Sequence, residues 1–386
     1  MTKTAAAFSG RGSASECAAE VVAQIREQES STPSALVVFA SPTLDLKELL
    51  TLLESNLHPS AMVGCSSAGE FAGGSQTEEG VSVLAIHSDE IRFHTCQGSG
   101  IREDAVRAAG EFAECLGADP FEHPYRYVLL LTDALAGFTE VFLTKVNQAT
   151  AGTYQLFGGG AGDGDRFQNT YVFSGTEVLK DSAVGLAILS KKPLGIGVRH
   201  GWTPLSEPMR ATETEGFELV SLNAEPALDV VTRYAEETGQ RFDPANPLSF
   251  FLHNVIGVTS TDGYKIRVPL GITERGGIIC ATEVPAGATV RIMGTDENSA
   301  VEAANEATET ALSQIGDRTP AGVLFFDCVA TRLRLGAHFG GELAAVRNQT
   351  SPAAFVGCNT YGQVARIDGQ FNGFHNCTAV VCVIPS

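Results

Sequence analysis

The sequence VGCSSAG at residues 63–69 returns as VGCNTYG at residues 356–362 and, more loosely, as FGGGAGD at residues 157–163. In each copy a short apolar run leads into a turn of small residues. Around each copy the same elements follow in the same order: a β-branched run, a stretch with apolar residues at helical spacing, the run with its turn, and a closing apolar run. Because chance rarely repeats such an order three times, we predict three copies of one folding unit.

The predicted units cover residues 35–86, 127–189 and 322–384. A strand–helix–strand order favours a right-handed crossover, which makes the two strands parallel. The strands are short and apolar without alternation, as is typical of sheets covered on both faces. Between the second and third units, turn residues separate strand-like runs, which indicates antiparallel strands. We therefore predict an α/β protein of two halves, with mixed β-sheets flanked by helices, built from repeated strand–helix–strand units with a glycine-rich turn.

The chain is long enough for more than one packed unit, since it has 386 residues, of which 44% are hydrophobic. A Pro- and Asn-rich stretch at residues 238–250 marks the expected division. We predict an N-terminal segment with a first helix at residues 1–34, a domain at residues 35–240 and a second domain at residues 241–386.

The formal net charge of −19 would repel phosphate backbones and anionic lipids, so we expect neither nucleic acid nor a membrane as partner. No apolar run approaches the roughly 18 residues of a transmembrane helix. The first residues lack the apolar core of a signal peptide, and we expect a cytoplasmic protein. The nine cysteines occur singly, without CxxC or zinc-ligand spacing, and are expected to be buried, reduced thiols.

The glycine turns are the first candidate binding site. A turn at the carboxyl end of a parallel strand exposes backbone N–H groups that can hold an anion or a carbonyl oxygen. We expect the first and third turns to face each other, with the main pocket at the junction of the two halves. The candidate ligand-binding residues are Gly64, Cys65, Ser66, Ser67, Gly69, Gly357, Cys358, Asn359, Thr360 and Tyr361. The alternative is that the glycines only permit tight turns or close packing.

Charged residues near the turns offer further contacts, and the catalytic motifs are incomplete. Five acids flank the turns and could bind an ammonium group or fix a ligand's hydroxyls, although an exposed, solvated carboxylate is the commoner case: Glu70, Asp163, Asp165, Glu342 and Asp368. Arg199, Arg332 or Arg366 could clamp a ligand carboxylate or a haem propionate. The residues 64–68, GCSSA, miss the GxSxG nucleophile elbow because alanine replaces its second glycine. We predict that the chain is not an enzyme. A thiol-dependent enzyme that uses Cys65 or Cys358 is the alternative, although no histidine lies near either in the sequence.

Several motifs resemble a known family. VGCSSAGEF (63–71), HGWTPL (200–205) and NAEPALDVV (223–231) resemble the FIST N-terminal domain; GVLFFDCVATR (322–332), FVGCNTYGQV (355–364) and FNGFHNCTAVVCVI (371–384) resemble the FIST C-terminal domain. The resemblance implies a FIST N-type domain at residues 35–240, a FIST C-type domain at residues 241–386, and an intracellular sensory role. Chain length and the FHNCTAVVC ending resemble a stand-alone branch of nitric-oxide-responsive haem proteins. The middle turn departs from the pattern, since it has no cysteine.

That branch implies a haem b cofactor and a separate partner, either a histidine kinase or a cyclic-di-GMP enzyme; a homodimer is left open. Haem needs an axial His, Cys, Met or Tyr in an apolar pocket, and the absence of CxxCH excludes covalent attachment. The candidate metal ligands are His200 and His375, with Trp202 and Phe374 as apolar neighbours. A lone histidine is more often a hydrogen-bonded structural residue. The alternatives to a haem sensor are a haem-free binder of small metabolites such as amino acids, and an interaction scaffold.

Overall fold

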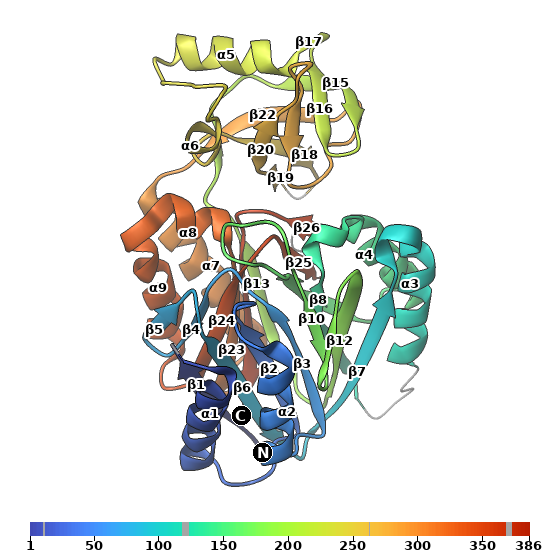
Figure 1. The fold of residues 1–386 in the computed structure, drawn as a ribbon, viewed down its shortest axis with the longest axis vertical. Helices are drawn as coiled ribbons and strands as arrows, with labels where there is room; N and C mark the ends of the chain where they lie inside the picture. Colours follow the sequence, from blue (N-terminus) through green and yellow to red (C-terminus); the bar gives the residue numbers. More distant parts are fainter. Residues whose placement is uncertain (11, 118–122, 262, 368–372) are drawn as a thin grey trace.

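The computed structural model describes residues 1–10, 12–117, 123–261, 263–367 and 373–386 (Figure 1). Within these ranges, three six-stranded sheets form the body of the molecule, and a nine-stranded fourth sheet is inserted into the third unit. The sheets combine parallel and antiparallel strands, and helices cover their outer faces. The predicted α/β fold with mixed, helix-flanked sheets is confirmed.

Each six-stranded sheet is built mainly by one unit of the chain. The first unit contains β1 (Thr2–Ser9), α1 (Ala14–Gln28), β2 (Ala35–Ala40), α2 (Leu46–Leu57), β3 (Ala61–Ser66) and β6 (Val81–Ser88). The second contains β7 (Ile91–Ser99), α3 (Ile101–Leu116), β8 (Tyr125–Thr132), η1 (Ala134–Ala136), α4 (Thr139–Ala149), β9 (Gln155–Gly160) and β12 (Ser182–Ser190). The third contains β13 (Gly195–Arg199), α7 (Glu297–Ile315), β23 (Pro320–Cys328), α8 (Val329–Leu335), η2 (Gly336–Phe339), α9 (Gly340–Thr350), β24 (Ala354–Thr360) and β27 (Ala379–Pro385).

The repeat is therefore longer than the sequence predicted, because each unit opens with an additional strand and helix. The predicted parallel pairs are present: β2 with β3, β8 with β9, and β23 with β24. In each unit the closing strand lies antiparallel to the first strand of that pair.

Short hairpins connect the three units in a ring. They follow the glycine turns and are formed by β4 (Glu70–Ala72) and β5 (Ser75–Thr77), by β10 (Val172–Ser174) and β11 (Glu177–Leu179), and by β25 (Gln363–Arg366) and β26 (Gly373–His375). Each of these three hairpins adds to the sheet of a different unit from the one whose turn it follows: β4 pairs with β24, β10 with β3, and β25 with β9. Each unit thus completes the sheet of another.

The inner faces of the three sheets share one apolar core. Phe326 of the third unit contacts Phe39 of the first and Phe157 of the second, with ring centroids 5.5 and 6.4 Å apart. On the outer faces, helices such as α2 pack with their apolar side. The N-terminus of α2 is capped by Asp45, which accepts a hydrogen bond from Glu48 N at 3.0 Å. Because both faces are covered, the strands are apolar throughout, as expected.

The fourth sheet forms a separate layer above the body (Figure 1). Its elements are β14 (Thr203–Pro204), β15 (Met209–Glu215), β16 (Glu218–Leu222), β17 (Glu225–Pro226), α5 (Ala227–Glu237), α6 (Leu248–Phe251), β18 (Val255–Ser260), β19 (Gly263–Arg267), β20 (Pro269–Ile272), β21 (Ile278–Cys280) and β22 (Thr289–Gly294). It is attached to the body by Lys265, which pairs with Glu140 at 3.0 Å, and by buried Arg267, which donates to Phe374 O at 3.1 Å.

The domain boundary near residue 240 stays a prediction. In the structure this position lies between α5 and α6, and both helices pack on one apolar cluster with β18 and β22. No helix in the described ranges has both the length and the apolar character needed to cross a bilayer.

Candidate functional site

The glycine turns of the three units meet at the carboxyl ends of β3, β9 and β24. Three backbone hydrogen bonds join the turns in pairs: Ala68 N to Asn359 O (2.9 Å), Tyr361 N to Gly160 O (3.0 Å) and Gly162 N to Ser66 O (2.9 Å). The first and third turns therefore lie together, as the sequence suggested, and the middle turn joins them. The same bonds occupy backbone donors that a ligand in the turns would need.

The glycines that precede these turns allow close packing between strands. A Cβ atom at Gly64 would lie 2.0 Å from Val38 O, and one at Gly357 would lie 2.0 Å from Phe325 O. Both distances are far below a van der Waals contact, so any larger residue would separate the strands. This observation favours the packing role over ligand binding for these two glycines.

Side chains in the turns are mostly buried and bound within the protein. Ser66 Oγ accepts from Tyr171 N at 2.9 Å, and Tyr361 donates to Asp163. Among the predicted ligand residues, Asn359 lines a cavity. The others lie in the joined turns or the strands behind them, and their binding role stays a prediction: Gly64, Cys65, Ser66, Ser67, Gly69, Gly357, Cys358, Thr360 and Tyr361.

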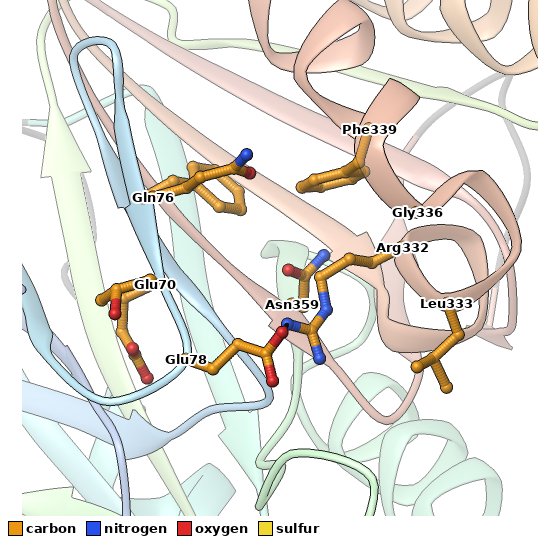
Figure 2. A pocket seen from close by; sticks show the side chains of 10 residues that line it. Glu70, Gln76, Glu78, Arg332, Leu333, Gly336, Phe339 and Asn359 are labelled. Atoms are coloured by element: carbon orange, nitrogen blue, oxygen red, sulfur yellow. Dashed lines mark ion pairs between the residues drawn. The ribbon is translucent and has the colours of Figure 1, made fainter.

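A cavity of about 400 Å³, named here the Arg332 pocket, lies beside the first and third turns (Figure 2). The β4–β5 hairpin of the first unit forms one wall, and α8 with η2 of the third unit forms the other. Its lining residues are Glu70, Phe71, Gln76, Thr77, Glu78, Arg332, Leu333, Gly336, Phe339 and Asn359. The N-terminal and C-terminal halves of the chain thus both contribute to it.

Arg332 places a guanidinium group between the two walls. Its side chain pairs with Glu78 of the hairpin, whose side chain is 65% exposed. The buried Nε atom of Arg332 has no hydrogen-bond partner among the described residues. The close approach of Arg332 depends on Gly69, because a Cβ atom there would lie 3.3 Å from its Nη1. The guanidinium is therefore positioned but only partly satisfied.

Asn359 adds a second unsatisfied donor to the same pocket. Its backbone is bound to the first turn, which fixes the residue, while its Nδ2 has no hydrogen-bond partner within the described part of the chain. Buried polar groups are normally hydrogen-bonded, so such a donor indicates a missing partner. The missing partner of an amide N–H and a guanidinium N–H is an acceptor, best of all a carboxylate.

Glu70 lies fully buried at the base of the pocket. It accepts hydrogen bonds from Ser67 Oγ and from Gly80 N, the latter at 3.2 Å. Burial raises the pKa of Glu70 from its ordinary value of 4.5 to about 8, against the opposing effects of these hydrogen bonds and of Arg332. At neutral pH the carboxyl group is therefore mainly protonated, and it does not cancel the charge of Arg332.

Two phenylalanine rings form the apolar part of the pocket. The rings of Phe71 and Phe339 lie 6.2 Å apart, and Leu333 continues this surface on α8. Figure 2 shows the Phe339 ring above Arg332 and Asn359. A cationic and amide end beside an aromatic end is suited to a small organic anion with an apolar portion.

The histidines proposed as iron ligands lie elsewhere, near the fourth sheet. His200 Nε2 contacts Tyr264 O at 3.0 Å, and Trp202 N donates to His200 Nδ1 at 3.2 Å, so both ring nitrogens are engaged. Burial lowers the pKa of His200, and it lowers that of His375 well below the ordinary value, aided by Lys265 and Arg267. Both histidines are therefore expected to be neutral.

These surroundings do not fit a haem. The hollow beside His200 and Trp202 has a volume of about 10 Å³, and the one beside Phe374 about 40 Å³, whereas pockets for ligands of this size occupy several hundred Å³. The Arg332 pocket is large enough but has no His, Cys, Met or Tyr in its lining. In the described ranges, no group of three or more His, Cys, Asp and Glu side chains is arranged to hold a metal ion.

Sequence reasoning had named Glu70 among five acids, Arg332 among three arginines, and Asn359, but could not place them in one pocket. Asp368, another of the five acids, lies outside the described residues. It missed the aromatic residues Phe71 and Phe339. Phe71 could have been suspected, because it follows the first turn directly. Phe339 gives no such signal, since it reaches the pocket only through the fold.

Comparisons with known proteins agree with the motifs. A FIST N domain model matches residues 34–225, and a FIST C domain model matches residues 227–366. An uncharacterized protein of Mycobacterium tuberculosis is 25% identical over 374 residues, which are 94% of each chain. An uncharacterized protein of Methanocaldococcus jannaschii is 23% identical over 294 residues, 68% of this chain and 54% of that protein. A cyanuric acid hydrolase from A. caulinodans covers 99% of both chains at 10% identity, but the TM-score of 0.34 is too low to support any conclusion.

Proposed function

This chain belongs to the FIST family, whose domains are found in signal-transduction proteins, and we propose that it is a sensor that binds a small metabolite through a carboxylate group in the Arg332 pocket. The observation that carries the proposal is the pair of unsatisfied donors, Arg332 Nε and Asn359 Nδ2, in the lining of one cavity. A carboxylate supplies acceptors for both groups.

Glu78 indicates where the ligand carboxylate would bind. Its own carboxylate already pairs with Arg332, yet the side chain remains 65% exposed. Exposed ion pairs contribute little stability, so a ligand with additional contacts can displace it. The aromatic rings of Phe71 and Phe339 would supply such contacts to an apolar side chain. Amino acids meet this description, because a displaced Glu78 can also accept a hydrogen bond from an ammonium group.

The position of the pocket suggests how binding would be transmitted. One wall belongs to the N-terminal half and the other to the C-terminal half of the chain. A ligand that bridges the walls favours the arrangement in which they lie close together, and this is the differential binding that shifts a two-state equilibrium. The recipient would be a separate cytoplasmic protein, a histidine kinase or a cyclic-di-GMP enzyme. Copurification with such enzymes would test the partner, and gel filtration would test whether the sensor is a homodimer.

Thermal unfolding of the full chain with a panel of amino acids and other carboxylates tests the proposal. A ligand at a hundred times its Kd should stabilise the protein by about 2.7 kcal/mol. Arg332→Ala should abolish the stabilisation. Glu78→Gln should strengthen it for carboxylates without an ammonium group, because the internal competitor is removed. Arg347→Ala is the matched control, because Arg347 approaches the same hairpin at Gly73 O, 3.4 Å away, from outside the pocket. A panel without any stabilising carboxylate would rule out this function.

Nitric oxide sensing through haem b remains a second, untested form of the sensor. The small hollow beside His200, of about 10 Å³, weighs against it. Purification with haem supplied, followed by an absorbance spectrum, would decide. A Soret band that disappears in His200→Ala or His375→Ala would support the haem form, and the absence of a band would remove it.

A further inference from the structure

A second cavity of about 360 Å³, named here the Arg102 pocket, lies in the second unit. Four segments line it: the start of α3 (Arg102), the segment from β8 into η1 (Asp133, Leu135), residues 168–170, and the link between β11 and β12 (Lys180, Asp181). Among the described residues, it shares no lining residue with the Arg332 pocket. Any ligand of this cavity is therefore recognised by a different set of side chains.

Arg102 is held in the pocket by a neutral partner. One of its terminal nitrogen atoms donates to Leu135 O at 3.0 Å. Within the described ranges its guanidinium group forms no ion pair with a carboxylate. A carbonyl oxygen orients the side chain without neutralising its charge, and a guanidinium has five N–H donors in all. Most of these donors thus remain available to an anion.

Lys180 is held in the same way on the neighbouring link. Its Nζ atom donates to Asn169 Oδ1 at 2.7 Å and lies 4.9 Å from the centre of the Tyr171 ring. Asn169 is itself fixed, because its N–H donates to the buried Asp163 carboxylate at 2.7 Å. No carboxylate in the described part of the chain pairs with Lys180. Two positioned cations that keep their charge therefore line one cavity.

The two acids in the lining are occupied by donors of the protein. Asp133, which is 4% exposed, accepts a hydrogen bond from Thr170 Oγ1. It also accepts from Leu135 N at 3.2 Å and from Asp181 N at 2.6 Å. Asp181 in turn accepts from Arg102 N at 2.8 Å, at the positive end of the α3 dipole. These donors offset the negative charge that the acids would otherwise direct into the cavity.

The repeat itself does not require such a cavity. The corresponding crevice of the third unit lies between α7 and α8, and Cys377 takes the position of Asp181, since both residues precede the closing strand with a φ of 49°. Trp202 and Arg334 line that crevice, which has a volume of only about 10 Å³. The open pocket is thus a property of the side chains of the second unit.

We propose that the Arg102 pocket binds a phosphate group, either as inorganic phosphate or as the phosphoryl end of a small molecule. A tetrahedral dianion presents acceptors in several directions and can meet an arginine fork and a lysine at once, whereas a carboxylate has a single charge in one plane. Leu135 is the only apolar side chain in the described lining, so the bound group should be polar throughout. The chain's charge of −19 opposes an anion from a distance, but physiological salt screens charges beyond about 8 Å.

Calorimetric titration of the full chain with inorganic phosphate, pyrophosphate and ADP in a phosphate-free buffer tests the site. At least one of the three should bind with a Kd below about 1 mM. Arg102→Gln and Lys180→Gln, both at exposed positions, should each weaken this binding about tenfold. Lys145→Gln is the matched control and should leave the affinity unchanged, because Lys145 Nζ is also held by an amide, Gln148 Oε1 at 3.2 Å, but outside the pocket.

The three anions also separate the two sources of the phosphate group. Equal affinity for inorganic phosphate and ADP would identify the free ion as the ligand, and binding of ADP alone would indicate a larger molecule. The proposal is wrong if none of the three binds, or if Lys145→Gln weakens binding as much as the pocket variants do. Binding that Arg332→Ala abolishes and Arg102→Gln leaves intact would also contradict it. Since Arg332→Ala should not affect the Arg102 pocket, the result does not depend on whether the Arg332 pocket binds a carboxylate.

Discussion

The Arg332 pocket has a smaller counterpart in the second unit, beside the hairpin that corresponds to β4–β5. In the second and third units alike, a hairpin from another unit lies beside the segment that follows the first strand of the parallel pair, which is β8 in the second unit and β23 in the third. In the third unit these are β4–β5 and α8, around a cavity of about 400 Å³. In the second unit Phe374 of β26 and Ala134 of η1 line a cavity of about 40 Å³, together with residues 137–141 at the start of α4 and with Phe217 and residues 281–283 from the region of the fourth sheet.

Aromatic side chains account for the difference. Phe374, on the β25–β26 hairpin, fills the second crevice so closely that a Cβ atom at Gly362 would lie 2.2 Å from its ring. Phe138 and Phe217, the latter from the fourth sheet, cover the opening. In the third unit's crevice the residue at the same register position of the hairpin is Gln76, and the cavity stays open at about 400 Å³. The repeated backbone thus supplies a crevice, and the side chains decide whether it can hold a ligand.

The two hairpins also differ in one polar residue. Glu70 starts β4 and Gln363 starts β25. Glu70 accepts from Ser67 and from Gly80 N; Gln363 donates to Thr360 Oγ1 and accepts from Thr378 N. In both cases the partners are a hydroxyl three residues earlier and the N–H before the closing strand. The carboxyl group occurs in the open crevice and the neutral amide in the closed one.

The largest expected effect on stability comes from replacing the glycine that pairs with the hairpin, which is Gly357 in the third unit. Gly357→Ala would place a methyl group 2.0 Å from Phe325 O and 2.3 Å from the Phe71 ring. We expect a loss on the order of 5 kcal/mol in the free energy of unfolding, measured by urea denaturation, or failure to fold. Gly110→Ala, in α3, is the control, because no atom lies within 4 Å of the added methyl group. Since alanine has the higher helix propensity, this substitution should raise the free energy of unfolding by about 1 kcal/mol. Similar effects of the two substitutions would contradict the packing role.

Phe374→Ala should convert the closed crevice toward the open one. Phe374 is 4% exposed, so its removal leaves a cavity and should cost about 3 kcal/mol in thermal or urea unfolding. Phe138→Ala is the control. Phe138 lines the same crevice but is 44% exposed, so its replacement should lower the free energy of unfolding much less. Equal losses would show that Phe374 is not what fills the second crevice.

The repeated units could be predicted from the sequence because the residue patterns that define them lie close together along the chain. The strands, the glycine turns and the helical spacing can each be recognised within one unit. The exchange of hairpins could not be predicted, since β4 has only three residues and its partner β24 lies almost 300 positions away. Arg332 was one of three candidate arginines for the same reason. Only the pairing of β23 with β24, which sets Asp327 opposite Asn359, brings the following helix and its arginine to that asparagine.

Glu70→Gln and its mirror Gln363→Glu test the polar difference between the hairpins. Because the folded-state pKa of Glu70 is raised from 4.5 to about 8, the native state binds more protons than the unfolded state between these values, and stability is lost as pH rises through this window. The loss is at most about 1.4 kcal/mol per pH unit. Glu70→Gln keeps an acceptor for Gly80 N, its amide can donate to Ser67 Oγ as Gln363 donates to Thr360 Oγ1, and the substitution should remove this slope in urea unfolding from pH 5 to 9.

Gln363→Glu should add a slope of the same sign, because it buries a carboxyl group in the closed crevice. Parallel pH profiles for wild type and Glu70→Gln would show that Glu70 ionises normally. That result would also contradict the inference that the Glu70 carboxyl group is mainly protonated at neutral pH.

The smallest effect concerns the donor that distinguishes the open crevice. Asn359→Asp is nearly isosteric, but it replaces the unsatisfied Nδ2 donor with a carboxylate oxygen beside Arg332. This internal carboxylate should compete with a ligand as Glu78 does, and from a buried position. We expect ligand affinity, measured by calorimetry with a carboxylate identified in the thermal panel, to fall about tenfold, or 1.4 kcal/mol. Protein stability should change less, because the new charge is paired. Unchanged affinity would show that Asn359 does not contact the ligand and that Arg332 alone defines the site.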